Sequence, residues 1–380
     1  MKNVIMLRSN AIDPDPRLEK EASALLDAGY SVKILGWDRE QQYNSTYSKS
    51  IGGKNVEVTL ARFKATFGGG LKNLLSLLCF QFWVFFKLLK ARKEFDVLHA
   101  ADFDTILPCF AMKLMFKEKK IIYDIYDFYV DAFTVPNCLK SIVRNLDFLA
   151  IKHSDAVIIA TEQRKEQISG ATPKKLVIIH NTPIESEIFK DSKNIFDENK
   201  NGRLKIVYVG ILQEHRFLKE MSDVVIKKPE IDLFIGGFGA LSSYFYDLSE
   251  KHKNIHFFGR VDYERSLQLS YSADVMVAVY DPVIPNHKFS APNKFYEALM
   301  LGKPLIVSKN TGVDDAVSKL DLGVVIEYNK SSFEDAIVNF DRDKFLSKKF
   351  KLYSNKIYSD SYSWKVMSER LVETYADLFK

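Results

Sequence analysis

The chain has 380 residues, more than one typical domain, and its 47% apolar and 27% charged residues predict two ordered cores and exclude a disordered chain. The formal charge of +5 comes from 54 basic and 49 acidic residues spread along the chain, which argues against a nucleic-acid partner. Three widely spaced cysteines (Cys79, Cys109 and Cys138) without a CxxC pair argue against a disulfide framework or a cysteine zinc site and favour a reducing cytoplasm.

The first half of the chain alternates short β-branched runs with segments of helical periodicity. Residues 4–7 lead directly from the start with no secretory-signal pattern, and Pro16 and Gly29 suit the two ends of a helix that follows. Repeated β-α-β units predict a parallel, doubly wound sheet. The strands expected in this half are 4–7, 31–37, 96–100, 120–126, 156–161 and 176–181.

Residues 73–93 (NLLSLLCFQFWVFFKLLKARK) are unusually rich in Leu, Phe and Trp and end in Lys87, Lys90, Arg92 and Lys93. The apolar part is shorter than the roughly 20 residues that cross a bilayer. One interpretation is a buried core helix. The other is an interfacial helix whose lysines meet anionic lipid, which predicts peripheral contact with the inner membrane face.

The polar segment 181–203 has no apolar periodicity and is the predicted linker. Strand patterns then resume, and 363–380 shows helical spacing of apolar residues. We therefore predict a first domain at 1–181, with helix 363–380 packing back on it, and a second domain at 182–362. The strands expected in the second domain are 204–210, 231–237, 254–259, 273–280, 303–308 and 323–328.

The densest polar constellation begins at His287 and runs into a helix that opens near Pro292. A helix N-terminus offers free N–H groups and a partial positive charge, which suit a diphosphate. Lys294 adds a full charge, and Glu297, three residues on, lies on the same helical face, where it can accept ribose hydroxyls. An ordinary exposed Lys/Glu pair is the alternative.

Arg216 is a second phosphate candidate, because it follows Gly210 at the end of the second domain's first strand. Considered alone, it could equally be a solvent-facing arginine in a loop.

With these residues in view, the chain resembles the retaining GT-B glycosyltransferases of the large family four, which build bacterial polysaccharides and glycolipids. The resemblance is spread over nearly the whole chain in the family's order, and its most specific part is APNKFYEALMLGKPLIV. The other segments are DPDPRLEKEASALLDAGYSVKIL, FDVLHAADFDT, KIIYDIYDFY, IVYVGI, IHFFGRV, YSADVMVAVY and SWKVMSERLVETY.

The resemblance implies two Rossmann-like domains facing across a cleft, with the nucleotide-sugar on the second and the acceptor on the first. It also implies hexose transfer with retention of configuration, without a metal or other cofactor, from an NDP-sugar (UDP-sugar favoured) to a glycan or polyprenyl-linked acceptor. The implied donor residues are Arg216 and Lys294 for the diphosphate, with Asn293 beside them, Glu297 for the ribose, and the backbone at Gly259, Arg260 and Val261 for the base. Arg216, Lys294 and Tyr126 are the predicted catalytic residues.

Three positions depart from the family's pattern. Phe289 stands where the first of two glutamates is usual, and Ile211 replaces an arginine that often follows Gly210. Tyr126 replaces a histidine; its hydroxyl can donate a hydrogen bond to a sugar but cannot act as a base near neutral pH. These departures keep two alternatives open, a non-catalytic GT-B subunit and, with less support, a sugar-nucleotide epimerase.

The family's glycine-rich loop after the first strand is replaced by AIDPDPR. Asp13, Asp15 and Arg17 are therefore the acceptor-side candidates, joined by Asp102 at the end of another strand. For Asp102, and for Asp104 beside it, turn and N-cap roles are at least as well founded. His99 is expected to be a packed histidine.

Overall fold

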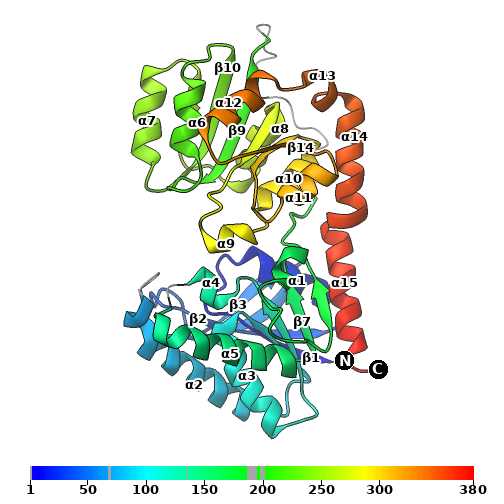
Figure 1. The fold of residues 1–380 in the computed structure, drawn as a ribbon. Helices are drawn as coiled ribbons and strands as arrows, with labels where there is room; N and C mark the ends of the chain where they lie inside the picture. The colour runs from blue at the N-terminus through cyan, green and yellow to red at the C-terminus, as the bar shows by residue number, and fades with distance from the viewer. Residues whose placement is uncertain (1, 67–69, 134, 186–194, 197–201) are drawn as a thin grey trace. The chain divides into compact units, whose positions relative to one another are not determined.

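The computed structural model describes residues 2–66, 70–133, 135–185, 195–196 and 202–380. The chain forms two compact units, Met1–Asn181 with Met367–Lys380 and Thr182–Val366, so the second unit runs beyond residue 362. Each unit has its own parallel sheet covered by helices (Figure 1). Most of the predicted linker at 181–203 lies outside the described residues.

The first unit contains an eight-stranded sheet in the order β3-β4-β2-β1-β5-β6-β7-β8. All pairings are parallel except that of β3 with β4, and Val4 of β1 lies between Val32 of β2 and Val97 of β5. The strands are β1 (Asn3–Leu7), β2 (Ser31–Trp37), β3 (Thr46–Ile51), β4 (Lys54–Ala61), β5 (Val97–Ala101), β6 (Lys120–Ile125), β7 (Ala156–Ile159) and β8 (Leu176–Ile178).

The helices of this unit follow the strands as crossovers. Asp15 caps the first of them by accepting a hydrogen bond from the Leu18 N–H, and Pro16 occupies its first turn. The helices are α1 (Pro16–Asp27), α2 (Leu74–Lys90), α3 (Phe103–Met115), α4 (Tyr129–Ala132) and α5 (Asn137–His153), with short 3₁₀ turns at Gly70–Asn73 and Glu162–Lys165.

The β3–β4 hairpin was not predicted from the sequence. Its turn consists of Gly52 and Gly53, with φ of 56° and 74°, the left-handed conformations that a two-residue hairpin turn requires. The Gly-Gly pair between alternating residues was the available signal.

The second unit contains a six-stranded, fully parallel sheet in the order β11-β10-β9-β12-β13-β14, the arrangement of a dinucleotide-binding fold. Its strands are β9 (Leu204–Ile211), β10 (Ile231–Phe238), β11 (Ile255–Phe257), β12 (Val275–Ala278), β13 (Leu305–Ser308) and β14 (Gly323–Ile326). Its helices are α6 (Leu218–Val225), α7 (Ser242–Lys251), α8 (Tyr263–Ser272), α9 (Pro285–Lys288), α10 (Asn293–Leu301), α11 (Asp314–Lys319), α12 (Lys330–Val338), α13 (Arg342–Phe345) and α14 (Lys348–Ile357).

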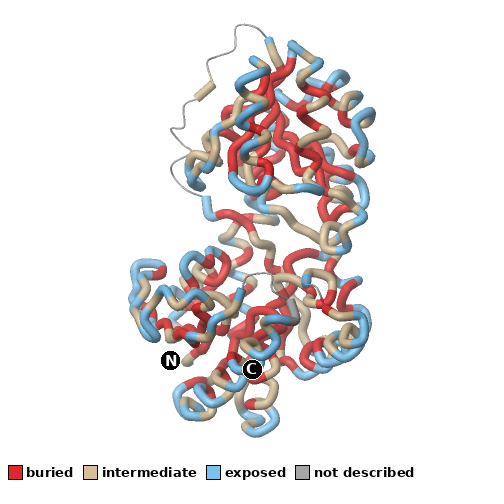
Figure 2. Tube along the Cα trace, turned by 90° about the vertical axis from the view of Figure 1, so that its left-hand side faces the viewer, coloured by how far each residue is buried: buried red, intermediate tan, exposed pale blue. Residues whose placement is uncertain are grey.

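The last helix, α15 (Trp364–Asp377), begins in the second unit and returns the chain to the first. Met367, Leu371 and Tyr375 are fully buried there, and the Tyr375 hydroxyl lies 2.8 Å from Nδ1 of the equally buried His99. Buried backbone runs through the centre of each unit, with exposed residues outside (Figure 2). The first core is thus completed by the end of the chain.

Helix α2 has two distinct sides. Phe80, Val84 and Leu88 are buried in the first core, whereas Phe82 and Phe86 are 63% and 61% exposed. The buried-core interpretation therefore holds for one side of the helix, and the interfacial interpretation stays a prediction for the exposed side. No helix in the described ranges is long and apolar enough to cross a membrane.

We predict that Leu371→Ala destabilises the first unit by about 2–5 kcal/mol, because the substitution leaves a cavity in its core. Urea unfolding followed by tryptophan fluorescence measures this, since Trp37 and Trp83 lie in that unit. Glu373→Ala, at an exposed position of the same helix, is the control and should change stability by less than about 0.5 kcal/mol. Equal effects of the two substitutions would contradict the assignment of α15 to the first core.

Candidate functional site

Each sheet has a point where the strand order reverses, between β1 and β5 in the first unit and between β9 and β12 in the second. Ligands of doubly wound folds bind outside the carboxyl ends of the strands at such points. Most of the predicted site residues follow strands at these two edges.

In the second unit, the ammonium group of Lys294 lies over the end of β9. It is 4.4 Å from the centre of the Tyr208 ring, and a Cβ added at Gly210 would lie 2.9 Å from it. Burial opposes its charge, but Tyr280, Tyr208 and Glu297 outweigh this and hold the pKa of Lys294 above its ordinary value. The lysine is thus charged at neutral pH, beside a backbone where only a glycine fits.

Arg216 lies at the same edge. Its guanidinium is 4.4 Å from the centre of the Tyr280 ring, which follows β12, and its Nε is buried without a hydrogen-bond partner. The charge of Arg216 lowers the pKa of Lys294, opposing the three groups above, so the two cations act on each other. The reversal point of the second sheet therefore carries two positive charges held on aromatic faces.

Helix α10 starts between these groups. Pro292 occupies the N-cap and no side chain caps the helix, while the Phe295 N–H of the first turn donates to the Pro292 carbonyl. Glu297, one turn on, is only 8% exposed, and the Tyr263 hydroxyl hydrogen-bonds it. The structure thus brings Lys294, Arg216 and the helix end together, while Glu297 lies deeper than the lysine.

The predicted base-binding backbone lies after β11. Gly259 has φ of 63°, and its carbonyl accepts a hydrogen bond of 2.7 Å from the Gly237 N–H. The Arg260 guanidinium lies 4.7 Å from the centre of the half-exposed Phe238 ring. Val261 packs close to Gly236, beneath this surface.

Sequence reasoning missed the aromatic residues that hold the cations, Tyr208 within β9 and Tyr280 just after β12. It also missed a pair beside Arg216: His215 Nδ1 lies 2.9 Å from the Asp281 carboxylate. His215 has φ of 63°, a conformation uncommon outside glycine. No spacing in the sequence links residues 215 and 281.

In the first unit, Tyr126 lies between two arginines. The guanidinium groups of Arg8 and Arg17 are 4.2 and 4.1 Å from its ring centre, and its hydroxyl oxygen is buried without a hydrogen-bond partner. Burial raises the pKa of Tyr126 well above its ordinary value. The hydroxyl predicted to donate to a sugar is therefore enclosed in this conformation.

The acceptor-side aspartates have internal partners. Asp15 caps α1 and accepts from Arg8 Nε at 3.0 Å. Asp102 pairs with Arg8 through one oxygen and accepts the Tyr126 and Asp127 N–H groups with the other. Asp13 is more exposed and pairs with Lys49 at 2.8 Å. Asp15 and Asp102 thus position the strand-end loops.

Arg17 is buried and bridges two carboxylates, Glu21 at 3.1 Å and Asp124. His99 Nε2 lies 3.6 Å from Glu21 and 3.5 Å from Asp124. These three residue types at this spacing could hold a metal ion. Arg17 already supplies the positive charge between the carboxylates, so the cluster does not need one.

Protonation of a carboxyl group is the other way to reduce the negative charge of this cluster. Burial, and then the neighbouring Asp124 carboxylate, raises the pKa of Glu21 to about 8. Burial also raises the pKa of Asp124 to about 6 and lowers the pKa of His99 to about 4. Near neutral pH we therefore expect a protonated Glu21, an ionised Asp124 and a neutral His99.

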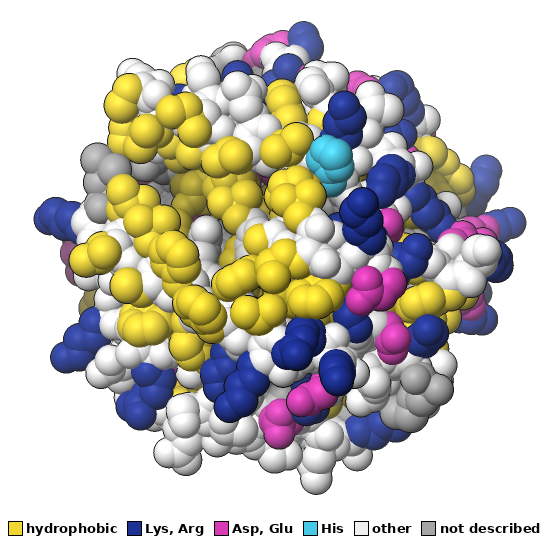
Figure 3. All heavy atoms as spheres, turned by 90° about the horizontal axis from the view of Figure 1, so that it is seen from below, with side chains coloured by type: hydrophobic (Ala, Val, Ile, Leu, Met, Phe, Trp, Pro, Cys, Tyr) yellow, Lys and Arg dark blue, Asp and Glu magenta, His cyan; other side chains and the backbone are white. Residues whose placement is uncertain are grey.

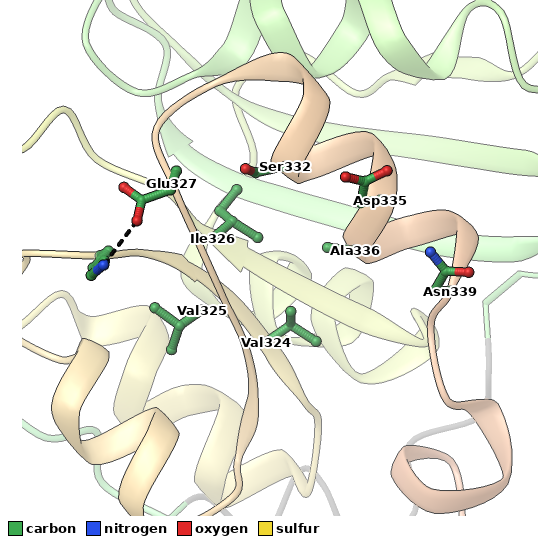
Figure 4. Close-up of a pocket in the computed structure, with 9 residues that line it drawn as sticks. Val324, Val325, Ile326, Glu327, Ser332, Asp335, Ala336 and Asn339 are labelled. Carbon is green, nitrogen blue, oxygen red and sulfur yellow. Dashed lines mark hydrogen bonds and ion pairs between the residues drawn. The ribbon is translucent and has the colours of Figure 1, made fainter.

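A cavity of about 630 Å³ lies elsewhere in the second unit, between β14 and α12 (Figure 4). Val324, Val325 and Ile326 line one side, and Ser332, Asp335 and Asn339 the other. No predicted site residue lines it, so it is separate from the Lys294 edge.

Residues 203–343 match the family model described as glycosyl transferases group 1. No curated protein matches the chain. Three solved structures illustrate the likeness of the fold.

The sucrose-phosphate synthase of Thermosynechococcus elongatus has a TM-score of 0.75 and 14% identity, over 100% of this chain and 99% of that one. HepE of Anabaena, solved with UDP and glucose, has a TM-score of 0.68 and 12% identity over 99% and 100%. A trehalose-6-phosphate structure from E. coli, bound with UDP-2-fluoro glucose, has a TM-score of 0.70 and 11% identity over 99% and 98%. The fold is therefore GT-B, and most of its second unit matches the group 1 glycosyl transferase model.

We predict that the wild-type protein loses about 1–2 kcal/mol of stability between pH 6.5 and 8 relative to Glu21→Gln. The folded state keeps a proton on Glu21 up to a pKa of about 8, whereas the unfolded state loses it near 4.5. The unfolding free energy therefore falls as pH rises through this window. His99 changes the pH dependence of stability only at lower pH, between about pH 4 and 6.5.

Chemical denaturation of both proteins at several pH values measures the difference. Glu373→Gln, at an exposed position, should follow the wild type. Parallel pH profiles for wild type and Glu21→Gln would mean that Glu21 is ionised in the folded protein.

Proposed function

We propose that the protein is a retaining hexosyltransferase that moves a hexose from a nucleotide-diphosphate sugar, a UDP-sugar by preference, to a glycan or polyprenyl-linked acceptor. The observation that carries the proposal is the pair of cations, Lys294 and Arg216, held on Tyr208 and Tyr280 at the reversal point of the second sheet. The group 1 sequence match covers this edge.

The arrangement suits a departing diphosphate. When the bond from the sugar C1 to the diphosphate oxygen breaks, negative charge grows on the leaving group. Two fixed cations and an uncapped helix end stabilise charge at that position without reorganising. The tyrosine rings hold the cations through their faces, and a hydrogen bond between the Lys294 and Tyr208 side chains also positions the lysine for phosphate oxygens.

The base and ribose would lie along the neighbouring strand ends. Gly237 and Gly259 bring bare backbone to this edge, and the Phe238 ring with Arg260 offers a flat, half-exposed surface to a base. Structures of the same fold have been solved with UDP-glucose and with ADP, which supports a nucleotide-sugar donor.

Retention rests on the family resemblance. The acceptor hydroxyl oxygen forms the new bond to C1 on the face that the diphosphate leaves, and its proton passes to the departing phosphate oxygen. No protein base is required for this step, in keeping with a tyrosine at position 126. The chemistry requires no metal, because Lys294 and Arg216 supply the positive charge.

We assign the reaction to polysaccharide or glycolipid biosynthesis in the cytoplasm, with the acceptor presented at the inner membrane face. In the proposed reaction, the buried cluster of Glu21, His99 and Asp124 does not contact the acceptor. Its role in this proposal is to hold Tyr126 and the strand-end loops of the acceptor unit.

An epimerase is the second candidate, and the hydrogen bond between His215 and Asp281 favours it. A carboxylate that orients an imidazole is a usual acid–base device. Conversion of a nucleotide-sugar to its epimer without an acceptor would select this function over transfer.

We predict that UDP binds without metal and that Lys294→Ala and Arg216→Ala each weaken binding by about 5- to 150-fold, since charge-assisted contacts contribute about 1–3 kcal/mol. Glu297→Ala should weaken binding over the same range if it contacts the ribose. Isothermal titration calorimetry with UDP, GDP and TDP, with and without magnesium, measures these affinities and identifies the base.

Lys319→Ala is the matched control, because Lys319 is an exposed lysine of the same unit on α11. It should bind UDP as the wild type does. Unchanged affinity in both Lys294→Ala and Arg216→Ala would refute the site, and absence of binding by every nucleotide would favour a non-catalytic subunit.

A further inference from the structure

The outer side of the first unit's α2, α3 and α5 exposes an unusual amount of apolar surface. We call it the apolar face and define it by the exposed residues of α2 (Leu75, Leu78, Phe82, Phe86), α3 (Leu114, Met115) and α5 (Ile142, Leu146, Leu149). Helix α3 packs against both α2 and α5. Figure 3 views this end of the unit and shows hydrophobic side chains gathered over a broad area, with many Lys and Arg and some Asp and Glu side chains around it.

The exposure on α2 follows the helical period. Leu75, Leu78, Phe82 and Phe86 recur at three- and four-residue spacing, and their exposed fractions are 74%, 43%, 63% and 61%. The opposite side of the helix is fully buried against the sheet. Helices of the second unit, where described, expose two large apolar side chains at most, on α14. A stripe of this size on α2 marks an interaction surface.

The exposed charged side chains of the three helices are all positive. Their only carboxylates, Asp104 and Asp147, are buried. Lys87 and Lys90 of α2 and Arg144 and Lys152 of α5 are exposed. An apolar surface bordered by cations, with no exposed carboxylate on its helices, is complementary to anionic phospholipid headgroups.

We propose that the apolar face docks on the surface of an anionic phospholipid bilayer, with Phe82 and Phe86 entering the headgroup boundary. The sequence predicted membrane contact through residues 73–93 alone. This proposal adds α3 and α5 to the contact surface and says which side of α2 faces the lipid. The docking does not depend on the proposed transfer reaction, although a polyprenyl-linked acceptor would be presented at the same surface.

A second copy of the chain fits this face less well. A two-fold interface places the same patch on both sides, so the cations of one copy would meet those of the other with no carboxylate from these helices between them. Lipid phosphates neutralise the same cations. Charge therefore favours a bilayer as the occupant.

The experiment is vesicle flotation of the full chain with phosphatidylcholine vesicles that contain or lack phosphatidylglycerol. The wild type should float with the anionic vesicles, and Leu75→Ser/Phe82→Ser/Phe86→Ser should lower its partition coefficient at least about ten-fold. Lys87→Glu/Lys90→Glu should lower binding as well and weaken its dependence on salt.

The matched control is Tyr246→Ser/Leu352→Ser/Tyr353→Ser, which removes exposed apolar side chains from the second unit and should float like the wild type. UDP affinity, measured on every variant, reports folding and the donor site separately. Vesicle binding without UDP binding would refute the proposed function alone.

Two results would overturn the docking proposal. One is a wild type that does not float with anionic vesicles, or a triple-serine α2 variant that floats equally well. The other is a dimer in light scattering that the α2 substitutions dissociate, which would make a second copy the occupant.

Discussion

The reversal of strand order in each sheet is the constraint on which both polar sites depend. Neighbouring crossovers leave in opposite directions at that point, so the strand-end loops separate and side chains there can meet a ligand. Both units place two cations and aromatic rings at this position. Arg8 and Arg17 enclose Tyr126 in the first, and Lys294 and Arg216 lie on Tyr208 and Tyr280 in the second.

The two sites differ in what balances the cations. In the first unit the side chains of Asp15, Asp102, Glu21 and Asp124 hold both guanidinium groups, and the three aspartates use their charge within the protein. In the second unit the cations rest on ring faces, which hold them in place without cancelling their charge. That charge remains available to an anionic ligand. Similar strand-end positions thus form a rigid support in one unit and, in the function we propose, the donor-binding edge in the other.

Much of the fold could be predicted because parallel strands and their crossover helices have different periods. The predicted strands all occur, and Pro16 and Gly29 mark the two ends of α1 as expected. The hairpin was missed because β3, its outer strand, consists mostly of polar residues and has no apolar run. In the site, the spacing of Lys294 and Glu297 on one helix was informative. The contacts of Tyr208 and Tyr280 with the cations, and that of His215 with Asp281, join distant segments, so only the folded chain reveals them.

The sequence also did not show which side of α2 is buried and which is exposed, because both sides are apolar. Only packing distinguishes the side that faces the sheet from the side left uncovered. Composition identified the segment as unusual, and burial decided which of its aromatic residues belong to the core.

The return of α15 to the first unit has a consequence for synthesis on the ribosome. Residues 182–366 are complete while the first unit still lacks the helix that supplies Met367, Leu371 and Tyr375. The first unit therefore lacks one helix of its core until the whole of the second unit has been translated. Until then, His99 also lacks its contact with the Tyr375 hydroxyl. The half of the chain made last can reach its final packing first, and the half made first closes only after residues 367–380 have been made.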